Sequence, residues 1–89
     1  ATIIENRAYV TAELRALGFT VLESSTNFVF AAHSGMAGSE IYRRLRENGI
    51  LVRHFDNPRI TAYNRITIGN RADMETLVAT LRKILEEQV

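Results

Sequence analysis

The chain has 89 residues, of which 46% are hydrophobic and 24% charged, a composition typical of one ordinary globular domain and too small for two. A formal net charge of +1 argues against binding nucleic acid or a membrane surface through charge alone, and the absence of cysteine excludes disulfides, thiolate metal ligands and cysteine nucleophiles. Since no apolar stretch is long enough to span a membrane and no signal peptide is recognisable, we expect a cytoplasmic domain.

The first part of the chain predicts a helix followed by two extended segments. Apolar residues recur at helical spacing between Ile3 and Leu17, and Gly18 is a natural end because glycine adopts the left-handed cap conformation without a Cβ penalty. Phe19–Leu22 is short and β-prone, and Asn27–Ala32 is dense in aromatic and β-branched residues, as in a buried strand. The Gly- and Ser-containing stretch His33–Gly38 predicts a loop.

A second helix and two further strands are predicted in the middle of the chain. Between about residues 37 and 48 the apolar side chains lie on one helical face, and Gly49 ends the pattern. Ile50–Arg53 and Arg65–Ile68 have the composition of strands, and the loop between them, His54–Asn64, holds the only proline.

The C-terminal segment predicts a third helix. Asn70 is placed to cap it, with Asp73 three residues later as in a capping box. Its apolar stripe consists of Met74, Leu77, Val78, Leu81, Ile84 and Leu85. Helices packed on one face of a small, mainly antiparallel sheet bury such stripes most economically, so we expect an α+β, two-layer sandwich.

Ten of the eleven basic residues are arginine, and the only lysine is Lys83. Chemistry that needs a lysine Schiff base must therefore use Lys83 or come from outside this chain. Lys83 points away from the apolar stripe of its helix and is predicted to lie at the surface. The cluster Arg43, Arg44 and Arg46 is interpreted as a solvated helix face, since glutamates lie beside it.

Two arginines are the strongest candidates for a binding site. If the strands around them pair antiparallel with Arg53 opposite Arg65, residue 51 lies opposite residue 67, and side-chain alternation sends both guanidinium groups to the face without helices. Like charges placed directly opposite repel, and an arginine fork suits a carboxylate or a phosphate. The residues therefore predict an anion site, and the alternative is a pair of solvated sheet residues.

The other polar and aromatic candidates are less specific. His33 is most simply a solvated loop histidine, and His54 with Asp56 forms an orienting pair without a recognisable nucleophile or third metal ligand. Phe28 and Phe30 are interpreted as core residues and not as a platform for stacking nucleic-acid bases, because their strand is otherwise apolar.

Three stretches of the sequence, taken in order, resemble a known family. They are LGFTVLESSTNFVFA (residues 17–31), LRENGILVRHFDNPRITAYNRITIGN (residues 45–70) and the closing helix. With TNFVF, GILVRHF and RITIG at this spacing, the single domain of residues 1–89 resembles the C-terminal small domain of histidinol-phosphate aminotransferases. These enzymes of histidine biosynthesis use pyridoxal phosphate and have the aspartate-aminotransferase fold.

The resemblance implies roles for both arginines and for a part of the enzyme outside this chain. By analogy with the family, Arg65 in NRITIG holds the substrate carboxylate, and Arg53 in ILVRHF belongs to the same substrate-anion site, where the phosphate is also held. The cofactor lysine and the other pyridoxal-phosphate contacts belong to a large domain that has no match here. We therefore expect this chain to be inactive alone, with no catalytic residue of its own, and the intact enzyme to be a homodimer.

Two alternatives remain open at this stage. Aromatic aminotransferases and threonine-phosphate decarboxylases share much of the pattern, so the substrate is less constrained than the fold. A stand-alone α/β module that binds an anion or a partner protein through the same arginine face is the other alternative. The opening Ala-Thr-Ile-Ile, with no methionine or cap before the helix, favours a truncated enzyme over a natural module.

Overall fold

In the computed structural model, which describes residues 3–23, 25–55, 57 and 59–87, the chain forms three helices and one four-stranded sheet. In chain order the elements are α1 (Ile3–Ala16), β1 (Phe19–Leu22), β2 (Phe28–His33), α2 (Gly38–Glu47), β3 (Arg53–His54), β4 (Asn64–Thr67) and α3 (Arg71–Glu87). The strand order is β1-β2-β4-β3, and every neighbouring pair is antiparallel. The predicted α+β fold is confirmed.

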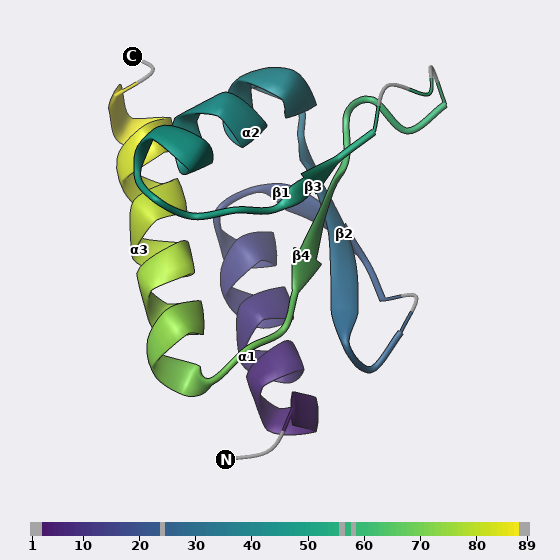
Figure 1. The fold of residues 1–89 in the computed structure, drawn as a ribbon, viewed down its shortest axis with the longest axis vertical. Helices are drawn as coiled ribbons and strands as arrows, with labels where there is room; N and C mark the ends of the chain where they lie inside the picture. The colour runs from purple at the N-terminus through teal and green to yellow at the C-terminus, as the bar shows by residue number, and fades with distance from the viewer. Residues whose placement is uncertain (1–2, 24, 56, 58, 88–89) are drawn as a thin grey trace.

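The helices and the sheet form two layers. Figure 1 shows α1 and α3 side by side on one side of the sheet, with α2 lying across one end of this layer. The opposite face of the sheet carries no helix in the described part of the chain. No helix among the described residues is long and apolar enough to cross a membrane.

The core lies between the three helices and the inner face of the sheet. Alternation along β2 and β4 sends every second side chain inward, and the apolar stripe predicted for α3 meets them there. The side chains that are less than 3% exposed at this contact are Val10, Leu14, Val29, Ala31, Ile41, Leu45, Leu77, Val78, Leu81 and Ile84. Burial of each large aliphatic side chain contributes roughly 1.5–3 kcal/mol relative to exposure, so this contact is the main source of stability.

The predicted helix ends are confirmed. Gly18 and Gly49 both have positive φ, at 95° and 79°. After α2, the Gly49 N–H donates to the Arg46 carbonyl and the Ile50 N–H donates to the Leu45 carbonyl, the two bonds of a Schellman cap. At the start of α3, the Asn70 side-chain oxygen accepts a hydrogen bond from the Asp73 N–H at 2.8 Å, as expected for an N-cap.

The prediction of a strand over Ile50–Arg53 was wrong in its extent. The arginine register is as predicted, with Arg53 opposite Arg65, but the ladder ends there and Leu51 does not pair with Thr67. The Schellman cap holds the chain against the end of α2, and Ile50 and Val52 pack against the core instead of extending the sheet. Tertiary anchoring therefore overrides the strand propensity of this segment.

Two predictions around β2 also need correction. Phe28 and Phe30 are not core residues: the inner face of β2 belongs to Val29 and Ala31, and both phenylalanines lie half-buried on the helix-free face. His33 is not a solvated loop residue but the last residue of β2. One ring nitrogen is 3.1 Å from the Leu17 carbonyl and the other accepts the Gly35 N–H, so the ring ties β2 to the end of α1.

Gly38, the first residue of α2, is the point where the β3–β4 connection packs on the helix. A Cβ built there would lie within 3 Å of three backbone atoms of Thr61 and Ala62. Only glycine therefore lets the backbone of the connection approach α2 this closely.

We expect Gly38→Ala to destabilise the domain by about 1–3 kcal/mol, because the added methyl group forces the backbone of the connection away from α2. Urea unfolding of the two forms measures this difference in free energy. Gly69→Ala is the matched control, since a Cβ there meets only ordinary contacts beyond 3.4 Å at a negative φ. Equal losses at both positions would contradict the close packing at Gly38.

Candidate functional site

Arg53 and Arg65 lie directly opposite each other on the helix-free face of the sheet. The β3–β4 ladder pairs their Cα atoms, and Arg53 is exposed whereas Arg65 is half-buried. Neither guanidinium forms an ion pair with a carboxylate in the part of the chain that the structure describes. Two like charges that face each other across a ladder are unfavourable, so this arrangement favours an anion between them.

Two arginines of α2 contrast with this pair, because each of them binds carboxylates. Arg43 binds both Glu40 and Glu47, and Arg44 reaches Glu87 of α3 at 2.6 Å. The hydrogen-bonded Glu40 carboxylate raises the pKa of the exposed Arg43 guanidinium above its ordinary value. Arg43 and Arg44 are therefore neutralised by glutamates, and Arg46 is exposed beside them, so the cluster is a solvated helix face as predicted.

Three phenylalanines surround the arginine pair. The guanidinium carbon of Arg65 lies 4.8 Å from the ring centre of Phe28, and that of Arg53 lies 5.5 Å from the ring centre of Phe55. Phe30 joins them: its ring contacts Phe28 edge-on at 5.7 Å and Phe55 at 6.0 Å. The aromatic rings attract both cations by cation–π interaction without forming ion pairs with them, which leaves their terminal nitrogens available to a ligand.

A shallow pocket of about 480 Å³ opens beside the two arginines. Its lining residues are Tyr42, Leu51, Val52, Arg53, His54, Arg65 and Thr67. The volume suits a small metabolite, and the arginines are its only permanently charged lining groups. The pocket is therefore suited to a small anion.

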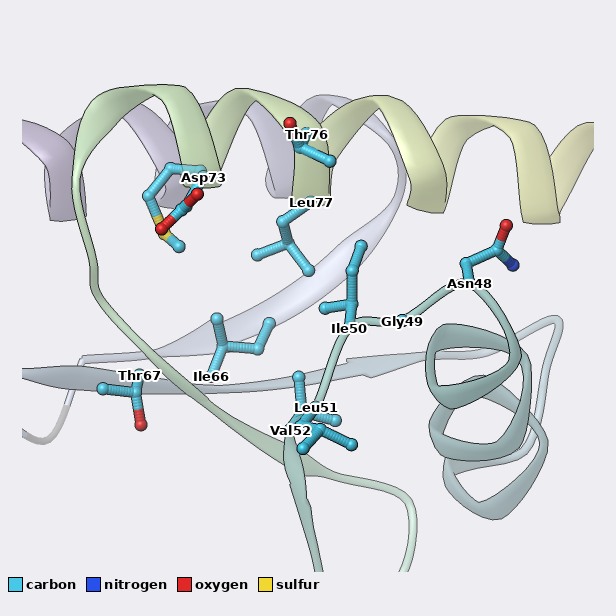
Figure 2. Close-up of a pocket in the computed structure, with 11 residues that line it drawn as sticks. Asn48, Gly49, Ile50, Leu51, Val52, Ile66, Thr67, Asp73, Thr76 and Leu77 are labelled. Atoms are coloured by element: carbon cyan, nitrogen blue, oxygen red, sulfur yellow. The ribbon is translucent and has the colours of Figure 1, made fainter.

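A second cavity, of about 410 Å³, lies between α3, the end of β4 and the segment over residues 48–52 (Figure 2). Figure 2 shows Ile66 and Leu77 projecting into it, with Asp73 at one end. It forms where the β3–β4 ladder stops short of Leu51 and Thr67. Since its one charged lining group is a carboxylate, it is not suited to an anion.

Asn64 is a buried polar residue that the sequence analysis missed. It is 2% exposed, and its Nδ2 donates to the Gly38 carbonyl at 3.0 Å. That bond orients the amide so that Oδ1 faces His54 Nδ1 at 3.1 Å and accepts a hydrogen bond from the Nδ1–H group. The shared parity of Asn64 and Ile66 in the strand is the signal that could have placed it on the buried face.

The remaining predicted candidates do not form a site. His54 is held by Asn64, and its predicted partner Asp56 lies outside the described residues. Lys83 is exposed on α3, as predicted. Among the described residues, no group of three or more histidine, aspartate or glutamate side chains is placed to hold a metal ion.

Comparison with known proteins shows that this chain is similar to aminotransferases. The family model for class I and II aminotransferases matches residues 1–81. Histidinol-phosphate aminotransferase 2 of Rhizobium meliloti is 51% identical over 93% of this chain, and the histidinol-phosphate aminotransferase of Clostridium beijerinckii is 48% identical over the same share. The chain spans only 24% and 23% of the lengths of these two relatives.

Solved structures agree on the fold. L-threonine-O-3-phosphate decarboxylase from Porphyromonas gingivalis superposes with a TM-score of 0.77 at 27% identity, over 91% of this chain and 26% of that one. A NifS-like protein superposes with a TM-score of 0.82 at 20% identity, over 94% and 27% of the two chains, and this likeness concerns the fold alone.

We expect Asn64→Ala to cost about 1–3 kcal/mol of stability, because it leaves the Gly38 carbonyl and His54 Nδ1 without their buried partner. Chemical denaturation followed by circular dichroism measures the loss. Asn27→Ala is the control, since that side chain is exposed. A loss at Asn64 no larger than at Asn27 would show that the buried amide contributes little.

Proposed function

The chain belongs to the class I and II aminotransferases, and we propose that it is the small domain of a histidinol-phosphate aminotransferase whose arginine face binds the anionic groups of the substrates. The observation that carries the proposal is the pairing of Arg53 with Arg65, without a carboxylate partner among the described residues, beside a pocket of about 480 Å³. Identities of 42–51% to histidinol-phosphate aminotransferases support this substrate class over more distant ones.

The proposed reaction makes a specific demand on these arginines. Histidinol phosphate carries a phosphate and no carboxylate, whereas 2-oxoglutarate carries two carboxylates and no phosphate. One site must therefore accept both kinds of anion in turn. The planar guanidinium fork of Arg65 donates two parallel hydrogen bonds to either group, and Arg53 adds a second positive charge that the doubly charged phosphate favours.

Aminotransferases of this family use pyridoxal phosphate, which supplies the electron sink for transamination in the intact enzyme. The described residues of this chain do not fit that cofactor. Its only lysine, Lys83, is exposed on α3, and neither pocket beside β4 contains a lysine. The role of this chain is thus to bind and orient substrate anions. A large domain would hold the cofactor, and the intact enzyme would assemble as a homodimer.

The alternative substrate class is that of threonine-phosphate decarboxylases. The Porphyromonas gingivalis relative with this activity in its name has the same small-domain fold, at 27% identity. Threonine phosphate carries a carboxylate and a phosphate on one molecule, so it would occupy both arginines at once. Discrimination between the two classes requires kinetics of the intact enzyme with both substrates.

Titration of the 89-residue chain with histidinol phosphate, followed by NMR, tests the anion site. We expect amide shifts confined to β3, β4 and the neighbouring part of β2, with millimolar or weaker affinity. Exposed ion pairs contribute only roughly 0–1 kcal/mol and are screened by salt, and no large domain excludes water here. Arg46→Gln, which removes an exposed charge from α2, should leave the shifts unchanged. Micromolar saturation elsewhere would reject the site and favour a stand-alone binding module.

In the intact enzyme, Arg65→Lys should lower kcat/KM by about one to three orders of magnitude, because an ammonium group cannot reproduce the bidentate fork and each charged hydrogen bond contributes roughly 1.5–3 kcal/mol. The loss should appear with histidinol phosphate and with 2-oxoglutarate, since both anions use the same fork. Steady-state kinetics of the two half-reactions measure it. A loss below about twofold, similar to that of an Arg46→Lys control, would argue against the proposed role.

A further inference from the structure

Phe28 and Arg65 belong to different strands but lie next to each other on the helix-free face of the sheet. The β2–β4 register pairs Phe30 with Arg65 and Phe28 with Thr67, so Phe28 is the diagonal neighbour of Arg65 on the same face. Long and aromatic side chains reach each other across such a diagonal. The 4.8 Å distance from the Arg65 guanidinium carbon to the Phe28 ring centre shows that they do so here.

The Arg65 side chain is partly buried against this ring. Its Nε is buried and has no hydrogen-bond partner in the described part of the chain. A buried donor without a partner is unfavourable, and the electron-rich face of the adjacent Phe28 ring offers compensation to the guanidinium group. The guanidinium therefore lies against the Phe28 ring, while its two terminal nitrogens form no ion pair with a carboxylate in the described part of the chain.

Phe28 is itself held in place. Its ring meets Phe30 edge-on, with ring planes at 87°, and Phe30 packs against Phe55 below Arg53. The backbone of Phe28 is fixed by the β2–β4 ladder, whose inner face is fully buried at Val29. Arg65 thus contacts, through one aromatic ring, a strand whose inner face is buried in the core.

We propose that Phe28 is a positioning residue for substrate anions: it holds the Arg65 guanidinium in a fixed plane before the anion arrives, so that binding does not have to order this side chain. The inference rests on the proposed anion site and adds a residue to it. Ordering a rotamer-rich side chain on binding reduces affinity, and pre-orientation avoids that loss.

The two arginines consequently have different tasks. Arg53 is exposed and its aromatic partner, Phe55, lies in a connection outside the sheet, so its position depends less on the core. Arg65 is half-buried against a sheet residue. Arg65 therefore selects the geometry of the anion, whereas Arg53 supplies an adaptable second charge.

The contact itself is measured on the 89-residue chain by NMR of the Arg65 Nε–H group. The Phe28 ring current should shift this resonance in the unaltered chain and in Phe28→Tyr, which keeps the aromatic face. Phe28→Leu should remove the shift. Unchanged amide resonances of Leu14 and Leu81, which are buried on α1 and α3 away from position 28, show that each variant keeps its fold.

The functional effect is measured by titrating the same proteins with acetate as the carboxylate probe. Phe28→Leu should weaken acetate binding about two- to fivefold, the loss that corresponds to an exposed cation–π contact. Phe28→Tyr should retain the affinity of the unaltered chain. Ile4→Ala is the matched control, because Ile4 is a 60% exposed apolar residue of α1, in the layer away from Phe28, and it should have no effect.

The outcomes separate this inference from the proposed function. Equal acetate affinities in Phe28→Leu and the unaltered chain overturn the positioning role alone, as does a failure of Phe28→Tyr to retain binding in a folded protein. An unaltered chain that shows no acetate-dependent shift at Arg53 or Arg65 overturns the anion site itself. Weaker acetate binding in Phe28→Leu, together with unchanged acetate binding in Phe28→Tyr, supports the inference.

Discussion

The alternation of side chains along β4 couples the core of this domain to its candidate site. Asn64 and Ile66 point inward, where they are 2% and 3% exposed, while Arg65 and Thr67 point to the helix-free face. Because β4 pairs with β2 on one side and β3 on the other, the packing of Ile66 in the core also sets the register of Arg65 against Arg53. A one-residue slip of β4 would expose Ile66 and bury Arg65.

This coupling explains how the fold maintains an unfavourable pair of charges. The mutual repulsion of Arg53 and Arg65 is small at the solvated surface, whereas the buried contacts on the opposite face are numerous and strong. The Phe28, Phe30 and Phe55 rings further stabilise the guanidinium groups without neutralising them. The charges of Arg53 and Arg65 therefore stay available for an anion. Those of Arg43 and Arg44 in α2 are not available, because these arginines are paired with carboxylates.

The helix-free face carries more apolar surface than an anion site alone requires. Leu22 and Leu51 are 48% and 78% exposed, and three half-buried phenylalanine rings come from β2 and from the residue after β3. Such a surface, next to the arginines, fits the proposal that a large domain covers it in the intact enzyme. Covering would also remove water from the guanidinium groups, which strengthens their hydrogen bonds to substrate. Exposure to water explains why we expect weak anion binding by this chain. Its removal in the intact enzyme explains why we expect a large effect of Arg65→Lys there.

The sequence by itself determined the helices and their ends, because these depend on local chemistry. Helical periodicity, Gly18, Gly49 and the Asn70 cap act over a few residues, and strand alternation fixes which residues share a face once two strands pair. Only the tertiary structure decided the rest. The cap after α2 keeps residues 50–52 out of the sheet. Val29 and Ala31 occupy the inner face of β2, so its phenylalanines lie on the face of the arginines. Asn64 forms hydrogen bonds with residues of α2 and β3. Each of these outcomes depends on groups that are distant in sequence and meet only when the layers pack.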